Sequence, residues 1–379
     1  MHYLFLVRHY PPEISGGARR PFLLVRALRR IGYKITLVTP FNVEDDPDHI
    51  CVIGSASNAI SDISSNKSTF NIFSNFKNVM RIWFLWPDAD ILWAKRVERA
   101  VIKSGITPDG IFTTSPSESI HIVGSRLAKR LNVHWVAEFR DTWFHNPHRK
   151  ILERSMLRRF VERLIARRAL KYVSGLTAVS RYVMNDILTF APVSVPHKII
   201  GHFSEEQKEK YILPSTDVNI VHSGGFTLSD RRRHLFPLLN IFEKTSLIRP
   251  KLHLHIAGRL TKDEKSLIDN SSAKITYHGQ ISLTKSQAMQ SAADGLVLYT
   301  PEESHALPGK YVEYCLARRP ILYLGGGDWM NLLENPENLR SLRKGLIELK
   351  KGEYVQNESC LSADKAAELL NIFFKKIQK

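Results

Sequence analysis

A lysine and a glutamate three positions apart follow a proline–glycine turn in the segment SHALPGKYVEYCLARRPILYLGGG. Pro308 and Gly309 are expected to open a helix whose first turns carry Lys310 and Glu313. Residues three apart share one helix face, and the backbone N–H groups at a helix start can bind an anion. This pattern predicts a phosphate site beside a carboxylate that accepts hydrogen bonds from a diol. Capping of the first turn, worth about 0.3–1 kcal/mol, is the alternative role for Glu313.

Two glycine-rich loops follow expected strands. The loop YPPEISGGARR contains Gly16 and Gly17 before a helix, and the loop SGGFTLSDRRRH contains Gly224 and Gly225. Glycine pairs allow a ligand to approach the backbone closely, although they also simply ease a turn. The first loop lacks the GxGxxG spacing of a dinucleotide site, so a nicotinamide or flavin cofactor is not expected there, and no cofactor is predicted. Three arginines in the second loop can bind phosphate oxygens or form a solvated basic run: Arg231, Arg232 and Arg233.

Short apolar runs alternate with amphipathic segments along most of the chain. An expected strand at 2–7 is followed by an expected helix at 18–31 and another strand at 34–39, which is typical of a parallel sheet covered by helices. A second series of strands begins near 218, and the proline-rich stretch 191–215 is the expected linker. The sequence therefore predicts an α/β protein with two doubly wound domains in tandem. The other expected strands are 110–115, 134–139, 175–180, 251–258, 274–279, 295–300 and 320–327.

The composition of the chain limits which binding partners and which cellular location are expected. The chain has 379 residues, and 54 Lys and Arg against 37 Asp and Glu give a net charge of +17. Such a charge favours phosphorylated ligands, nucleic acid or an anionic membrane surface as partners. The chain has three cysteines and no CxxC pair, which is typical of a reducing compartment. Its N-terminal apolar run is too short for a signal peptide, and it has no apolar run of about 20 residues that could span a bilayer. These features predict a cytoplasmic protein.

Six motifs in order resemble a retaining glycosyltransferase of the GT-B architecture, in the family 4 type. The motifs SPSESIHIVG and EFRDTW are similar to a branch found in bacterial surface-polysaccharide enzymes. The resemblance implies two Rossmann-like domains that face each other across a cleft: an acceptor domain at 1–195 and a donor domain at 196–360. A C-terminal helix at 361–379 is then expected to pack back on the first domain. The motifs lie within residues 10–39, 106–143, 176–187, 220–225 and 307–322.

The resemblance implies roles for the donor-site residues. Glu313 would accept hydrogen bonds from the ribose hydroxyls of a nucleotide-diphosphate sugar, and Lys310 with the 306–310 turn, which includes Leu307, would bind the diphosphate. His305 stands where many relatives have a second glutamate that contacts the transferred sugar. The glycine pair 16–17 would approach the donor. The main chain of Gln280 and Ile281 would bind the base. Gly224 and Gly225 would mark the start of the donor domain. The family arginine is absent at Phe226, and Arg231, Arg232 or Arg233 would replace it.

The same resemblance places three further residues on the acceptor side. Asp141 would position or deprotonate the acceptor hydroxyl, and Arg140 would anchor a phosphate or orient Asp141. His121 is expected about two turns into a helix, either as a catalytic or as a packed structural histidine. The acceptor would be a glycan or a lipid-linked glycan. Positive charge from Lys310 and the arginines would stabilise the leaving phosphate, so no metal is expected. The DAD triplet at 88–90 is the weak alternative, a metal site.

Three other interpretations depend on single features. A sugar-nucleotide 2-epimerase would have the same architecture and nucleotide site. A nucleic-acid-binding protein would account for the charge, but the sequence has no zinc spacing and no interleaved basic and aromatic run. The arginine-rich segment 151–170 is either a solvated helix packed on the sheet or a peripheral contact with the inner face of the cell membrane. Its apolar stripe consists of Leu157, Phe160, Val161, Leu164 and Ile165.

Overall fold

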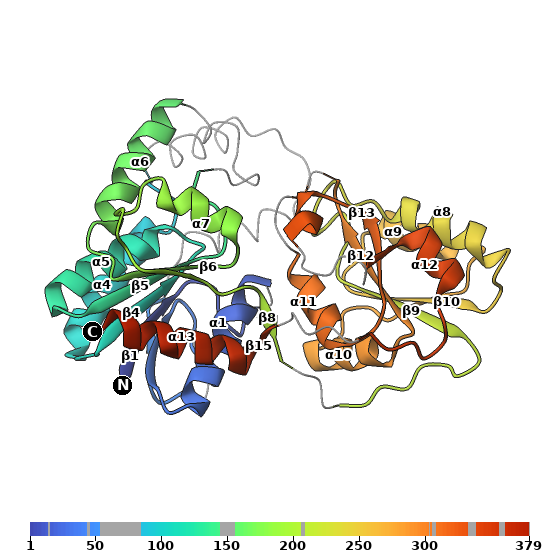
Figure 1. The fold of residues 1–379 in the computed structure, drawn as a ribbon, viewed down its shortest axis with the longest axis horizontal. Coiled ribbons are helices and arrows are strands. Elements are labelled where there is room, and N and C mark those ends of the chain that lie inside the picture. The colour runs from blue at the N-terminus through green and yellow to red at the C-terminus, as the bar shows by residue number, and fades with distance from the viewer. Residues whose placement is uncertain are drawn as a thin grey trace. The chain divides into compact units, whose positions relative to one another are not determined.

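The computed structural model divides the chain into two compact units, and each is described here by itself. Unit 1 comprises Met1–His202 together with Ala363–Lys379, and unit 2 comprises Phe203–Ser362. Figure 1 shows a parallel sheet with covering helices in each unit. The structure describes residues 1–13, 16–43, 46–53, 85–144, 156–205, 209–302, 304, 308–332, 339–355 and 361–378.

Unit 1 contains a seven-stranded sheet in the order β3-β2-β1-β4-β5-β6-β7, in which every neighbouring pair is parallel. The order reverses between β1 and β4, so the loops after these strands open at the same edge, where ligands bind in doubly wound folds. The strands are β1 (His2–Val7), β2 (Lys34–Thr39), β3 (His49–Cys51), β4 (Gly110–Thr114), β5 (His134–Phe139), β6 (Gly175–Ala178) and β7 (His197–Ile199).

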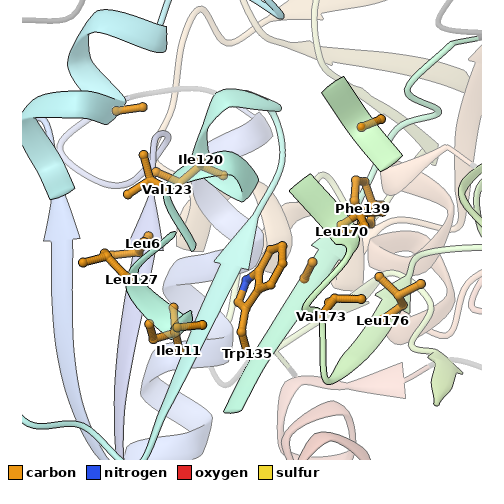
Figure 2. Packing of buried hydrophobic residues seen from close by; sticks show 14 of the residues in the cluster. Leu6, Ile111, Ile120, Val123, Leu127, Trp135, Phe139, Leu170, Val173 and Leu176 are labelled. Atoms are coloured by element: carbon orange, nitrogen blue, oxygen red, sulfur yellow. The ribbon is translucent and has the colours of Figure 1, made fainter. Parts of the chain in front are cut away.

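Helices cover both faces of this sheet because its strands are apolar on both faces. On one face, Leu4 and Leu6 of β1 pack into a cluster with α4, α5, α6 and α7, and Figure 2 shows Trp135 among the side chains of this cluster. On the other face, the ring of Phe374 in α13 stacks on Tyr3 at 4.1 Å. The helices are α1 (Gly16–Arg30), α4 (Ile91–Ser104), α5 (Ser119–Leu131), α6 (Met156–Leu170), α7 (Arg181–Leu188) and α13 (Ala363–Ile377).

The last helix, α13, is far from α1 in sequence and lies beside it in unit 1 (Figure 1). The Tyr33 hydroxyl donates a hydrogen bond to Asn371 at 2.8 Å, and Arg30 forms an ion pair with Asp364. The chain therefore returns to unit 1 after completing unit 2.

Unit 2 contains a six-stranded parallel sheet in the order β11-β10-β9-β12-β13-β14, which reverses between β9 and β12. A separate two-stranded pair joins β8 to β15. The strands are β8 (Phe203–Ser204), β9 (Val218–Ser223), β10 (Leu252–Ala257), β11 (Ile275–Tyr277), β12 (Gly295–Thr300), β13 (Ile321–Gly325), β14 (Leu339–Ser341) and β15 (Leu361–Ser362). The helices are α8 (Leu235–Ser246), α9 (Lys262–Asp269), α10 (Leu283–Ala292), α11 (Gly309–Leu316) and α12 (Leu342–Glu348), with a 3-10 helix at Asp328–Leu332.

The two predicted doubly wound domains are confirmed, and the main differences lie at edges and surfaces. The expected linker 191–215 contains β7, which pairs with β6 and extends the sheet of unit 1. The apolar stripe expected at 157–165 divides in α6, because Phe160 and Leu164 are exposed while Val161 and Ile165 are half-buried. The buried side of the helix carries Ala166 and Leu170 instead. Within the described ranges, no helix is both long and apolar enough to cross a membrane.

Candidate active site

The glycine loop after β9 approaches the loop after β10 closely. Gly224 and Gly258 have φ angles of 136° and 149°, which L side chains rarely adopt. A Cβ atom on Gly258 would lie 2.2 Å from the Gly224 carbonyl oxygen. Gly225 is also crowded, since its Cβ would lie 2.8 Å from Ser229 Oγ. Glycine is therefore required here to bring the two strand ends together at the carboxyl edge of the sheet.

The lysine and glutamate that follow the proline–glycine turn form an ion pair in the first turns of α11. Pro308 precedes the helix, and Lys310 Nζ lies 2.8 Å from Glu313 Oε2. The Lys310 side chain is 34% exposed and that of Glu313 is 10% exposed. The pair is therefore accessible from one side, and Lys310 places a positive charge beside the free N–H groups of the helix start.

A network of buried polar side chains contacts Glu313 on its inward side. Gln290 Nε2 of α10 donates to Ser223 Oγ at 2.7 Å and lies 3.4 Å from Glu313 Oε2. The Tyr314 hydroxyl accepts a hydrogen bond from the Ser223 backbone N–H at 3.2 Å. Because Ser223 ends β9, this network fixes the position of Glu313 relative to the glycine loop. Gln290, Ser223 and Tyr314 belong to separate segments with no shared motif, so no sequence pattern predicted this network.

The three arginines of the glycine loop have different surroundings. Arg231 and Arg232 are exposed, and Arg232 forms an ion pair with Asp230 at 2.8 Å. Arg233 is half-buried, and its buried Nε has no hydrogen-bond partner among the described residues. Burial lowers the pKa of the Arg233 guanidinium, and Asp230 partly offsets this effect. Arg233 is therefore the arginine of the three whose position is suited to a bound anion.

His222, in β9, lies close to both cations. Its Nδ1 lies 3.1 Å from the Val297 carbonyl oxygen, which requires the proton to be on Nδ1. Burial, with smaller contributions from Arg233 and Lys310, outweighs the hydrogen bond to Val297 and lowers the pKa of His222 to about 4, so the ring is neutral at pH 7. Its Nε2 is then an acceptor, and it has no partner in the described part of the chain.

Unpartnered buried polar atoms thus gather around the Lys310–Glu313 pair. They are Gln290 Oε1, His222 Nε2 and Arg233 Nε. Buried polar atoms without partners are uncommon in folded proteins and often mark a position where a ligand or water binds. Together with Lys310 and Glu313, these groups offer donors for an anion and acceptors for hydroxyl groups.

The loop after β11 lies at the same edge of the sheet. Gln280 is exposed and Ile281 is half-buried against the apolar cluster that includes Val312. The Gly279 carbonyl accepts a hydrogen bond from the Gly258 N–H at 2.8 Å, which joins this loop to the end of β10. His305 and Leu307 lie outside the described residues.

In unit 1, Arg140 joins three loops at the carboxyl edge of the sheet. Its side chain donates hydrogen bonds to the carbonyl oxygens of Ser115 and Gly17, and its backbone N–H donates to Ser115 Oγ at 3.2 Å. Burial lowers the pKa of Arg140 to about 10, which still leaves it charged at neutral pH. Asp141 is exposed next to it. Gly16 and Gly17 are the first two residues of α1.

Beneath Arg140, a buried ion pair connects β5 to α1. Glu138 is 1% exposed and accepts hydrogen bonds from Arg20 Nη2 and Thr114 Oγ1, both at 2.8 Å. Burial acts to raise the pKa of Glu138, but Arg20, Thr114 and Arg140 outweigh it, and the net effect is a lowered pKa. Arg20 also donates to the carbonyl oxygens of Ile200 and Gly201. The sequence analysis assigned no role to this pair.

His121 lies in the first turn of α5 rather than two turns into it. The side chain is fully buried, its Nδ1 lies 2.8 Å from Thr113 Oγ1, and its ring packs 4.3 Å from that of Phe139. Burial lowers its pKa to about 3, so the ring is neutral at pH 7. These surroundings favour the structural interpretation of His121, because its ring is packed between Thr113 and Phe139.

Both aspartates of the DAD triplet have structural partners in unit 1. Asp88 accepts a hydrogen bond from the Ser119 backbone N–H at 2.8 Å, at the start of α5. Asp90 forms an ion pair with Arg8, whose Nε lies 3.2 Å from Asp90 Oδ1. Among the described residues, no group of three or more His, Cys, Asp or Glu side chains is placed to hold a metal ion.

Comparisons with solved structures identify proteins of the same fold, although no family model matches the chain and no curated protein sequence is significantly similar. A sucrose-phosphate synthase from Thermosynechococcus elongatus superposes with a TM-score of 0.62 at 13% identity, over 100% of this chain and 99% of that one. The lipopolysaccharide outer core galactosyltransferase WaaB gives 0.57 at 10% identity, over 99% and 100% of the chains. A candidate UDP-N-acetylglucosamine 2-epimerase from Listeria monocytogenes gives 0.59 at 11% identity, over 99% and 96%.

At these identities the likeness concerns the fold alone. It extends over nearly the whole of each protein, so both units of the chain are included. The chain therefore has the fold of two Rossmann-like domains that these glycosyltransferases share with the epimerase.

Proposed function

We propose that the chain is a glycosyltransferase that uses a nucleotide-diphosphate sugar as donor, with unit 2 as the donor-binding unit. The observation that carries this proposal is the group of polar side chains around the start of α11. Lys310 and Arg233 offer positive charge to a diphosphate, and the helix start adds backbone N–H groups. Glu313, held by Lys310 and Gln290, offers carboxylate oxygens to the ribose hydroxyls. A single nucleotide contains both the phosphates and the ribose hydroxyls that these two sets of groups would bind.

In the proposed reaction, negative charge develops on the leaving diphosphate oxygen as the bond to the sugar breaks. Lys310 and Arg233 stabilise this charge, and the ion pair with Glu313 already holds Lys310 at the start of α11. The reaction then needs no metal ion. The acceptor hydroxyl attacks from the face that the diphosphate leaves, which retains the anomeric configuration, and the leaving phosphate accepts the hydroxyl proton.

Unit 1 supplies the acceptor residues in this proposal. Asp141 is exposed at the carboxyl edge of the sheet, where it can accept a hydrogen bond from an acceptor hydroxyl. Arg140 acts as a positioning residue, since its hydrogen bonds to Ser115 and Gly17 fix the strand end that carries Asp141. The acceptor is a glycan, soluble or linked to a lipid, and nucleic acid has no part in the reaction.

A sugar-nucleotide 2-epimerase is the second candidate, because a candidate epimerase is among the structures with this fold. It would use the same nucleotide site but would invert one carbon of the sugar without an acceptor. Only the transferase needs an acceptor, so a reaction of the donor alone distinguishes the epimerase from it.

The experiment has two stages. Thermal unfolding with a panel of nucleoside diphosphates and nucleotide sugars identifies the donor, because a ligand at about 100 times its dissociation constant adds about 2.7 kcal/mol to the free energy of unfolding. The selected donor is then incubated with the protein, with and without a glycan acceptor, and the products are analysed by NMR. Transfer to the acceptor with retained configuration is expected. Epimerised nucleotide sugar in the absence of acceptor would overturn the proposal.

A further inference from the structure

The outward side of α6 carries an apolar stripe that the fold does not cover. Met156, Phe160 and Leu164 are 89%, 62% and 51% exposed, and their spacing of four places them on one side of the helix. The inward side is occupied by Glu162, Ala166 and Leu170, which are buried. Large exposed side chains at regular spacing differ from the single exposed apolar residues that most surfaces carry.

Arginines accompany this stripe along the helix. Arg159, Arg163 and Arg167 are exposed, and their spacing of four follows that of the apolar residues. Arg168 is exposed as well. We call these residues, together with Met156, Phe160 and Leu164, the α6 surface. An apolar stripe beside a row of arginines is typical of a helix that lies in the interface of a membrane.

A groove of about 950 Å³ extends the α6 surface toward α4 and α5. Leu164 and Ile165 of α6 and Ile122 of α5 contribute apolar side chains to its lining. Six cations also line it: Lys95, Arg126, Lys129, Arg167, Arg168 and Lys171. The side chain of Tyr172 lies under both Lys129 and Lys171, at 5.2 and 5.3 Å from the ring centre.

The charge of this face is strongly one-sided. The described residues that line the groove include no carboxylate. Glu98 lies 3.4 Å from Arg126, and Glu162 of α6 is buried. The occupant is therefore expected to be anionic. The occupant must also contact the apolar side chains of Met156, Phe160 and Leu164. A nucleic acid would place its charged phosphates against these side chains, which is unfavourable.

We propose that the α6 surface and its groove bind the surface of an anionic phospholipid bilayer. Phe160 and Leu164 enter the boundary between headgroups and acyl chains, and the arginines contact the phosphates. The cations of the groove, Lys95, Lys129 and Lys171, extend the same contact beyond the helix. This surface lies entirely within unit 1 and includes none of the residues assigned to the donor site.

Sedimentation with vesicles tests the proposal. The full chain is mixed with vesicles of equal parts phosphatidylglycerol and phosphatidylcholine, or of phosphatidylcholine alone, at low salt and near 1 M salt. Strong binding to the anionic vesicles at low salt and weak binding to the neutral ones is expected. Because surface charges are screened within about 3 Å at 1 M salt, only the apolar part of the contact should then remain.

Two variants separate the charged from the apolar contribution. The triple variant Arg159→Gln, Arg163→Gln, Arg167→Gln should bind anionic vesicles on the order of a hundredfold more weakly, at roughly 1 kcal/mol per arginine. The double variant Phe160→Ser, Leu164→Ser should retain binding at low salt but lose the part that persists at high salt. Nucleoside diphosphate affinity should not change in either variant, because the proposed donor site lies in unit 2.

Matched control variants lie in unit 2. Arg343→Gln with Lys344→Gln removes exposed charges from α12, and Phe236→Ser removes a 60% exposed ring from α8. Both should bind vesicles like the unchanged protein. Equal losses in the control and α6 variants, or no binding to anionic vesicles, would overturn the proposal. A dimer in analytical ultracentrifugation that Phe160→Ser dissociates would do so too, because the stripe would then be an interface between two copies.

Discussion

The carboxyl edges of the two sheets both carry charged side chains, but the charges are compensated differently. In unit 1, Glu138 is buried and accepts hydrogen bonds from Arg20 and Thr114, and Arg20 also bonds two backbone carbonyls. In unit 2, Lys310 is one-third exposed and the buried Nε of Arg233 has no partner among the described residues.

This difference distinguishes a structural site from a binding site. A buried ion pair whose hydrogen bonds are all made offers nothing to a ligand, and removing one partner leaves an uncompensated charge. A half-exposed group with unused donors can bind a ligand without breaking an existing contact. On this basis the polar cluster of unit 1 around Glu138 holds β5 to α1, while the cluster of unit 2 is the one that we propose as the donor site.

The largest expected effect is on the compensated pair. Glu138→Ala should lower the free energy of unfolding by about 3–5 kcal/mol, because it leaves Arg20 charged and buried without its carboxylate. Urea-induced unfolding measures the change. Asp364→Ala, which breaks the exposed pair with Arg30, is the matched control and should cost no more than about 1 kcal/mol. Equal costs for the two variants would contradict the distinction.

On the unit 2 side, Lys310→Ala should lower the turnover rate by on the order of a hundredfold, the effect of removing one group that stabilises transition-state charge. Its stability should change little, because the side chain is one-third exposed. If Lys310 and Arg233 supply the positive charge, EDTA should leave turnover largely intact. Complete inhibition by EDTA with recovery on addition of manganese would instead indicate a metal-dependent enzyme.

Glu313→Ala should weaken donor binding at least tenfold while the fold persists. Hydrogen bonds to a charged group contribute about 1.5–3 kcal/mol each, and the variant removes the acceptor for two ribose hydroxyls. Calorimetric titration with the nucleoside diphosphate gives the affinity. The 2′-deoxynucleotide should bind the unchanged protein more weakly but the variant about equally. An unchanged affinity would mean that Glu313 only caps the helix.

Among the arginines, Arg233→Ala should weaken binding of the nucleoside diphosphate by about tenfold, through the loss of one charged hydrogen bond. Binding of the free nucleoside should not change. Arg231→Ala is the control, since Arg231 is exposed in the same loop. If both substitutions weaken binding equally, the loop acts through its general charge and the distinct position of Arg233 has no functional meaning.

The last expected effect concerns acid stability. The pKa of buried His121 is lowered to about 3, whereas an unfolded histidine titrates near 6.5. Between these values the unfolded state binds a proton that the folded state does not, so the free energy of unfolding falls as the pH falls through this window, by up to about 1.4 kcal/mol per pH unit. His121→Asn should make unfolding less dependent on pH between 6 and 4. Identical slopes would mean that His121 is protonated in the fold.

Local patterns predicted most of the architecture. The apolar run His134–Phe139 and the run at 295–300 form strands with the expected bounds, because fully buried parallel strands are apolar throughout. Short edge strands such as β3 and β14 were missed, since three residues carry no periodicity. At the candidate site, the ion pair of Lys310 and Glu313 agrees with their predicted position on one helix face.

The sequence by itself determined which segments form strands and helices, and where the glycines and charged residues stand along them, because these depend on neighbours within a few positions. Only the tertiary structure decided how each charge is compensated, since Glu138 meets Arg20, and Gln290 approaches Glu313, through contacts between distant segments. The tertiary structure likewise decided which side of α6 faces the core. Phe160 and Leu164 have the periodicity of core residues, yet burial of Ala166 and Leu170 against α5 and β6 turns them outward, and periodicity alone does not specify what a helix packs against.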